Sequence, residues 1–330
     1  MPNSVVIGLS AVVVAIRDGE AVVLTVRPKG AEFLGQEFRG QALQGLPFGP
    51  FDPAGHRTFE LALRAFVTEQ TRFNLGYVEQ LYTFGDKGRD APLADMGAGP
   101  GDDGARVISV GYLALAPAAP ERHTPDSAWQ PWSRFFPWED WREGRPGALG
   151  PIEAALRRWA ANDAQRLSRA RLLFALDGAI WNEERVLERY ELLYEAGLAP
   201  ETARDRGERP LDLPDALKAA LGEPMISDHR RILATALSRL RGKLKYRPVM
   251  FELMPEAFTL SALQRAVEAI VGAPLHKQNF RRALERAELV HGLGRLETDT
   301  GGRPAELFRF RREVLQARPV SGLTIPLVRD

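Results

Sequence analysis

The stretch 276–310, HKQNFRRALERAELVHGLGRLETDTGGRPAELFRF, constrains the fold of this 330-residue chain more than any other. Its first half predicts an amphipathic helix, because Phe280, Leu284 and Ala287 recur at helical spacing with basic residues between them. Its second half predicts a β-hairpin, in which Gly301-Gly302 supplies the positive φ angles of a tight turn. A basic helix followed by a basic hairpin is the outline of a winged helix-turn-helix.

The residues before that stretch supply the other helix of the motif. The segment 258–264 reads as a helix start with Thr259 or Ser261 as its N-cap, and Gly272-Ala273-Pro274 ends the helix. The second helix of such a motif enters the DNA major groove, where Arg bonds guanine and Asn bonds adenine. The candidate DNA-binding residues are Lys277, Asn279, Arg281, Arg282 and, at the hairpin tip, Arg303. Winged helices also bind proteins, so the pattern alone leaves a protein-binding or structural role open.

The composition excludes several kinds of site. The chain has no Cys, which rules out disulfides and thiolate metal sites, and its five His residues lack ligand-like spacing, so we expect no metal. The net charge is +1, but residues 225–330 carry more basic than acidic side chains, which places any nucleic-acid surface there. The apolar run near the N-terminus is short, lacks a preceding basic region and reads as a strand. We therefore expect a cytoplasmic protein with no membrane association.

The first 120 residues read as strands arranged around one helix. Strands are predicted at 5–16, 21–26, 78–86 and 107–115. Asp18-Gly19 between the first two strands indicates a hairpin turn, and the helix is predicted at 58–71. This order of elements indicates an α+β sandwich.

The middle of the chain combines a Pro- and Trp-rich segment with helices. Residues 117–151 read as irregular, and their aromatic side chains are expected to pack on the first domain. Helices are predicted at 152–171, 182–196 and 226–240, and a charged linker at 201–210. His229 has no metal partner in view and is expected to be a hydrogen-bonding group on the surface.

The order of elements in the first 120 residues, with Leu46-Pro47-Phe48-Gly49 before the helix, resembles the Nudix fold, an α/β/α sandwich. The glutamates of the Nudix signature hold magnesium against a diphosphate. Arg64 and Glu69 fit its Arg and its last Glu, whereas Ala65 and Thr68 stand where two metal-binding Glu belong. The resemblance implies a degenerate domain with no catalytic residue, which still binds a nucleotide.

The candidate ligand-binding residues of this domain are Arg27, Arg39, Phe48, Arg64 and Glu69. For Arg64 and Glu69, a surface pair or a capping contact is an equally good interpretation.

Motifs at both ends of the chain narrow the resemblance. The segments 241–249, 251–255, 275–282 and 301–307, together with EQLYTFGD at 79–86, resemble the Nudix-related transcriptional regulators of NAD biosynthesis, the NrtR type. The helical insert at about 120–222 resembles the longer alphaproteobacterial branch, the NadQ type. The domains implied are a Nudix-like ligand-binding domain at 1–120, an insert at 121–224 and a winged helix-turn-helix domain at 225–330.

The resemblance implies a homodimeric repressor that binds a palindromic operator in double-stranded DNA. It requires no cofactor, and its effector is ADP-ribose, ATP or another adenine nucleotide. Two alternatives to the repressor stay open. One is an active Nudix hydrolase of a nucleoside diphosphate derivative such as ADP-ribose, and the other is an adaptor whose domains both bind protein.

Overall fold

A mixed six-stranded sheet forms the centre of the N-terminal part of the protein. The computed structural model describes residues 5–28, 37–38, 41–86, 89, 106–117, 119, 124–209, 211–246, 249–297 and 304–311. The sheet has the order β6-β7-β1-β2-β8, and the short strand β5 also pairs with β1. Its strands are β1 (Val5–Arg17), β2 (Glu20–Val26), β5 (Phe48–Pro50), β6 (Tyr77–Phe84), β7 (Arg106–Ala116) and β8 (Ser127–Pro131). The pairing of β1 with β7 is parallel, and the other pairings are antiparallel.

The predicted hairpin turn between β1 and β2 is confirmed. Asp18 and Gly19 both have positive φ angles, 52° and 80°, as a two-residue turn of this kind requires. A separate ribbon is formed by β3 (Glu37–Phe38) and β4 (Gln41–Ala42).

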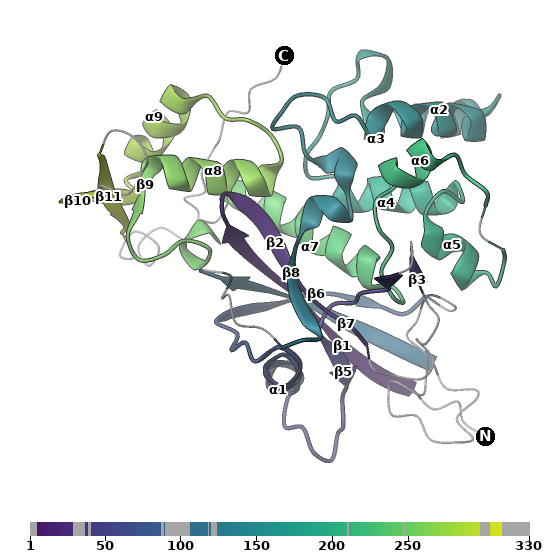
Figure 1. Ribbon diagram of the computed structural model, residues 1–330, viewed down its shortest axis with the longest axis horizontal. Helices are drawn as coiled ribbons and strands as arrows, with labels where there is room; N and C mark the ends of the chain where they lie inside the picture. The colour runs from purple at the N-terminus through teal and green to yellow at the C-terminus, as the bar shows by residue number, and fades with distance from the viewer. Residues whose placement is uncertain are drawn as a thin grey trace.

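The two faces of the sheet are covered by different helices (Figure 1). Along β1, Leu9, Ala11 and Val13 belong to the core beneath α1 (Phe59–Thr71), whereas Val12 and Val14 belong to the core on the other side. This alternation follows from the period of two along a strand. Thr58 caps α1, because its side chain accepts a hydrogen bond from the backbone N–H of Leu61.

The second face is covered by α7 (His229–Tyr246) and by the aromatic segment after β8. Ile232, Leu233 and Leu237 of α7 share one core with Leu113 of β7. The result is the α/β/α sandwich that the sequence predicts. Because α7 lies against the sheet, it packs with the first domain, although the sequence analysis places it at the start of the third domain. The domain boundary at 224/225 stays a prediction.

The Pro- and Trp-rich segment is more regular than predicted. It contributes β8 to the edge of the sheet and two short 3₁₀ helices, η3 (Trp132–Arg134) and η4 (Pro137–Glu139). Trp132, Phe136 and Trp138 are buried in the same core as the sheet residues, which confirms that the aromatics pack on the first domain.

After this segment, the described part of the insert contains the helices α2 (Leu149–Ala160), α3 (Ala164–Phe174), α4 (Val186–Glu195), α5 (Pro200–Asp205) and α6 (Asp215–Ala220), with η5 (Leu176–Gly178) between α3 and α4. The single helix predicted at 152–171 is wrong, because Ala161 takes a φ of 43° and Asp163 caps a new helix. The charged linker predicted at 201–210 is also wrong. Glu201 is buried in α5, where it accepts hydrogen bonds from the Met225 N–H and from Arg230.

The C-terminal unit has the predicted winged helix-turn-helix form. After η6 (Val249–Glu252) come β9 (Phe258–Thr259), α8 (Leu260–Val271), α9 (Lys277–Ala287), β10 (Val290–Glu297) and β11 (Ala305–Phe310). Thr259 caps α8, and Gly272 ends it with a φ of 73°. The wing strands have the order β10-β11-β9. The tip of the predicted hairpin, 298–303, lies outside the described residues. Of the helices in the described parts of the chain, none combines the length and apolar character needed to span a membrane.

Candidate nucleic-acid interface and ligand pocket

Helix α9 presents its polar side chains to solvent. Phe280 and Leu284 are buried against α8 and the wing, and they hold the helix with one face inward. The exposed side chains are Lys277, Gln278, Asn279, Arg281, Arg282, Glu285 and Arg286. Four of the five predicted DNA-binding residues therefore lie on one exposed helix; the fifth, Arg303, lies outside the described residues.

The outermost face of α9 includes two residues that we did not predict. Gln278, Arg282 and Glu285 are spaced four and three residues apart, so they share the face opposite Phe280 and Leu284. A helical projection of the sequence, centred on those two apolar residues, would have found them. Gln can bond adenine, and the carboxylate of Glu can accept a hydrogen bond from the amino group of cytosine.

Among the described residues, three cations of α9 have no acidic partner. Within the described residues, no carboxylate forms an ion pair with Lys277, Arg281 or Arg282. No side chain caps the N-terminus of α9 at His276. The first backbone N–H groups of a helix lack partners within the helix and carry a partial positive charge, so this end is suited to an anion such as phosphate.

The wing stands beside α9. Strand β11 pairs with β10 on one side and, through Leu307, with Thr259 at the start of α8 on the other, so the wing and the helices form one unit. Arg295 and Arg309 are exposed on the two strands. The guanidinium of Arg309 donates a hydrogen bond to the imidazole of His291 at 2.6 Å.

A cavity of about 460 Å³ lies at the end of β2, next to the C-terminus of α1. It is lined by Val26, Arg27, Pro28, Phe48, Glu69, Gln70, Arg72, Thr124, Pro125 and Asp126. Three predicted ligand-binding residues, Arg27, Phe48 and Glu69, therefore meet at one site. Arg39 lies outside the described residues, and Arg72 is a lining cation that we did not predict.

Hydrogen bonds hold the walls of this pocket in place. The side-chain amide of Gln70 bonds both the N–H and the carbonyl of Phe48, at 3.2 and 2.6 Å. The Thr124 hydroxyl donates to the Gln70 carbonyl at 2.8 Å. The pocket thus offers an aromatic ring and the guanidiniums of Arg27 and Arg72, beside Glu69 and Asp126. Such a set of groups suits a ligand with an anionic part and a flat ring.

Arg64 has a structural position instead. Its guanidinium donates to the carbonyls of Leu75 and Gly76, at 2.5 and 3.0 Å, and pairs with Glu60 at 2.8 Å. It does not line the pocket, and it pairs with Glu60 rather than with Glu69. Arg64 therefore closes the loop that follows α1.

The described residues offer no metal site on α1. Thr68 uses its hydroxyl on the loop at Phe73 and Asn74. Glu60 is paired with Arg64, which leaves Glu69 as the free carboxylate of the helix. No group of three or more His, Asp or Glu side chains suited to an ion occurs in the part of the chain that the structure describes.

His229, which we expected on the surface, is buried at the start of α7 with only 3% of its area exposed. Its Nδ1 accepts a hydrogen bond from the Leu46 N–H at 2.9 Å. Its ring meets the pocket residue Phe48 edge to face, with 5.0 Å between the centroids. Burial, reinforced by the nearby Arg204, lowers the pKa of His229 to about 3, so the imidazole is neutral.

The structure thus joins an α/β/α sandwich that contains a pocket to a winged helix whose second helix exposes basic side chains. Comparison with known families agrees: residues 250–310 match the NrtR DNA-binding winged helix domain. The chain is NrtR-like in its fold and in the sequence of its winged helix.

Individual relatives extend this comparison. The ADPR responsive transcriptional repressor NtrR of Acinetobacter baylyi is 39% identical over 98 residues, which are 28% of this chain and 37% of that protein. The chain thus matches well under half of the relative's length. Crystal structures with a similar fold include Shewanella oneidensis NrtR complexed with a 27mer DNA, with a TM-score of 0.52, 20% identity, and coverage of 97% of this chain and 99% of the other. A MutT/nudix family protein from Enterococcus faecalis has the same TM-score at 13% identity, with coverage of 94% and 90%.

Proposed function

We propose that this protein is a ligand-responsive transcriptional repressor that binds double-stranded DNA through α9 and the wing. The observation that carries the proposal is the exposed face of α9, whose cations have no acidic partner among the described residues and whose N-terminus is uncapped. Lys277 and the helix N-terminus would hold phosphate, while Asn279, Arg281 and Arg282 would reach base edges in the major groove. Arg303, which the sequence predicts at the tip of the hairpin, would contact the DNA backbone or the adjacent minor groove.

The effector is an adenine nucleotide that carries a diphosphate, with ADP-ribose as the first candidate and ATP as the second. In the pocket, Arg27 and Arg72 would bind the diphosphate, and Phe48 would lie against the base. The name of the Acinetobacter relative, an ADPR responsive repressor, supports this choice. The protein would need no cofactor, and its targets would be genes of NAD biosynthesis.

The repressor would act as a homodimer on a palindromic operator. Two identical winged helices related by a two-fold axis contact two half-sites one helical turn apart, and the symmetry of the DNA sequence then follows from that of the protein. Binding of the effector changes operator affinity only insofar as it binds the two states of the protein unequally.

The nucleotide would be bound without being hydrolysed. Magnesium at a diphosphate requires several carboxylate oxygens, and among the described residues Glu69 is the one carboxylate of α1 without an ion-pair partner. The competing function, hydrolysis of ADP-ribose, is tested by incubating the protein with ADP-ribose and Mg²⁺. We expect no turnover beyond the rate without protein, and turnover that depends on Mg²⁺ would favour the hydrolase.

The direct test of the repressor uses fragments of the genome that encodes the protein. Fragments retained by the purified protein are tested for a mobility shift with and without ADP-ribose, ATP and NAD. Salt is held constant, because phosphate contacts make the affinity salt-dependent. We expect a specific shift that ADP-ribose or ATP changes. Equal retention of every fragment in the presence of competitor DNA would show that binding does not depend on the DNA sequence, which would contradict a repressor with a specific operator.

A further inference from the structure

Helix α7 runs from the wall of the ligand pocket to the first helix of the winged unit. At its first residue, His229 contacts Phe48 of the pocket wall and Leu46, two residues before it. About three helical turns later, Arg241 contacts the end of α8. One helix thus contacts both a residue of the pocket and the helix that packs against α9, although the pocket and α9 belong to different parts of the sequence.

The contact at the pocket end is tight. An added Cβ at Gly45 would lie 2.6 Å from Ile226 and 2.8 Å from the Nδ1 of His229, so no side chain fits there. The Ile226 N–H donates to the Gln44 carbonyl at 3.0 Å, and Gln44 also forms a bridge with Met225. The chain on both sides of Gly45 is therefore bound to the start of α7.

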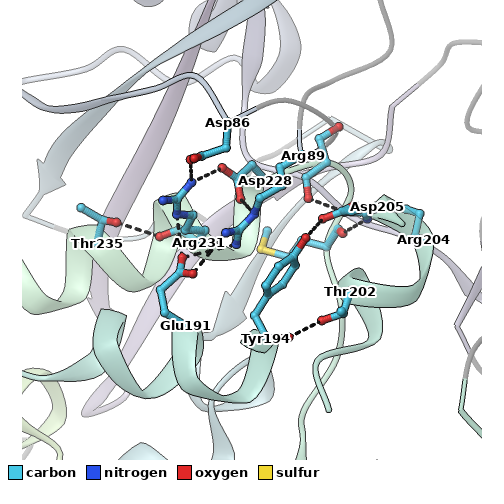
Figure 2. Close-up of polar contacts among 12 residues, drawn as sticks. Asp86, Arg89, Glu191, Tyr194, Thr202, Arg204, Asp205, Asp228, Arg231 and Thr235 are labelled. Carbon is cyan, nitrogen blue, oxygen red and sulfur yellow. Dashed lines mark hydrogen bonds and ion pairs between the residues drawn. The ribbon is translucent and has the colours of Figure 1, made fainter. Parts of the chain in front are cut away.

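Polar contacts also fix this end of α7 to the sheet and the insert (Figure 2). Arg231 pairs with Glu191 of α4 at 2.6 Å and bonds Asp86 at the end of β6. Asp228 pairs with Arg89 at 3.3 Å. A displacement of the pocket wall would therefore act on the whole of α7 rather than on one side chain.

The contact at the other end uses the last carbonyls of α8, which a helix cannot satisfy by itself. The Ile270 carbonyl accepts a hydrogen bond from Arg241 at 2.9 Å, and the Ala269 carbonyl accepts one from the Trp132 indole at 3.2 Å. The Gly272 carbonyl accepts one from the Trp141 N–H at 2.7 Å. All three donors come from α7 or from the segment after β8, so α8 is oriented by the ligand-binding part of the protein.

A buried ion cluster keeps Arg241 in place. Glu139, Arg189 and Arg241 are each no more than 1% exposed. Arg189 and Arg241 contact the Glu139 carboxylate at 2.5 and 2.6 Å, and the Arg241 guanidinium also lies 4.8 Å from the centroid of the Trp132 ring. Each guanidinium also donates to a backbone carbonyl, Arg189 to Asn182 at 2.8 Å and Arg241 to Glu183 at 2.9 Å, so several bonds hold Arg241 in this position.

We propose that α7 transmits occupancy of the ligand pocket to the winged helix, with His229 as the positioning residue at the pocket end and Arg241 with Trp132 at the α8 end. The proposal rests on the proposed function. A ligand that displaces Phe48 moves the segment 46–48, whose Leu46 N–H is bonded to His229, and so shifts α7. Because α8 is bound to α7 and to Trp132 by its last turn, that shift changes how α9 is presented to DNA.

The test measures a coupling ratio, defined as the operator Kd with saturating effector divided by the operator Kd without it. The effector is ADP-ribose or ATP, whichever changes operator binding by the wild-type protein. Trp132→Phe keeps the buried ring but removes the indole N–H that bonds α8. Trp159→Phe is the matched control, since Trp159 lies in α2, where its ring meets the exposed Arg166.

A second pair of variants tests the pocket end. His229→Leu removes the acceptor for the Leu46 N–H, whereas His229→Asn places an amide oxygen where Nδ1 stands. In Trp132→Phe and His229→Leu we expect the coupling ratio to change by about threefold or more towards 1, the value without coupling. His229→Asn and Trp159→Phe should keep the wild-type ratio. By reciprocity, operator binding must change effector affinity by the same reduced factor.

The outcomes separate this inference from the proposed function. If the wild-type protein responds to the effector and Trp132→Phe and His229→Leu respond equally well, α7 is not the coupling element and the repressor stands. If the wild-type protein binds operator without any response to either nucleotide, the effector-responsive function and this inference are both overturned. Loss of coupling in Trp159→Phe as well would show a general loss of structure and would also contradict the proposed positions.

Discussion

The imidazole of His229 accepts a hydrogen bond from the backbone N–H of Leu46, 183 residues earlier in the chain, at 2.9 Å. This bond closes the first domain, because it joins the loop before β5 to the helix that covers the second face of the sheet. It requires a neutral ring, which burial provides by lowering the pKa of His229 to about 3. The bond therefore links the stability of the fold to pH.

His229→Asn should change that pH dependence. An unfolded chain binds a proton at His229 near pH 6.5 and the folded protein only near pH 3, so the histidine lowers stability as pH falls from 6.5 towards 3. The free energy of unfolding of the wild type, relative to that of the variant, should thus decrease on acidification, with a slope of at most about 1.4 kcal/mol per pH unit. Urea titrations at pH 4 to 7 measure this difference.

Asp228 does not confuse the comparison. Burial raises the pKa of Asp228 from 3.8 to about 7, although Arg89 and Arg231 lower it. The stability that Asp228 contributes is therefore lost as pH rises from 3.8 to about 7. The sign is opposite to that of His229, but both proteins contain Asp228 and its effect cancels in the difference. A difference that does not vary with pH would contradict a neutral, buried His229.

Arg282→Ala should weaken operator binding by about 1–3 kcal/mol if the guanidinium reads a base. Arg282 lies on the outermost face of α9 and has no acidic partner among the described residues, so its removal should leave the fold intact. Arg158→Ala removes the same charge from an exposed position on α2 and serves as the control. Mobility shifts at one salt concentration compare the two variants, and equal affinities would remove Arg282 from the interface.

Gly272→Ala should destabilise the junction between α8 and the insert. The residue has a φ of 73°, and an added Cβ would lie 2.3 Å from the Glu139 carbonyl and 2.7 Å from the Arg241 guanidinium. Gly178→Ala is the control, since Gly178 has a φ of 81° but faces open space. Through conformational strain, Gly178→Ala should lower the free energy of unfolding by about 1–2 kcal/mol, and Gly272→Ala should lower it clearly more. Similar urea midpoints for the two variants would show that the junction can expand at little cost.

Glu139→Gln should be among the most destabilising single changes. It removes the carboxylate that pairs with both Arg189 and Arg241, and removal of one partner of a buried pair costs about 3–5 kcal/mol. Glu223→Gln removes a carboxylate that pairs with Arg134 at the surface and should cost less than about 1 kcal/mol. Thermal unfolding of the two variants gives the comparison, and a stable Glu139→Gln protein would mean that another acid replaces the carboxylate.

The winged helix and the core of the Nudix-like domain were predictable from the sequence because their elements are local. The apolar spacing of Phe280 and Leu284 defines the inner face of α9, and Thr58 and Thr259 cap their helices through bonds to residues three positions away. Of the ligand-binding residues that the resemblance to the Nudix fold implied, Arg27, Phe48 and Glu69 line one pocket and Arg64 does not, and their binding of a ligand stays a prediction.

Tertiary structure alone decided which charged groups are buried. Glu139 meets Arg189 and Arg241 across 50 and 102 residues, and no periodicity in the sequence indicates such a contact. His229 and Glu201 likewise read as surface residues, because the loops and helices that cover them lie far away in the chain. Local patterns determine helices, strands and their exposed faces, whereas the cost of burying a charge is met only by partners that the complete fold brings together.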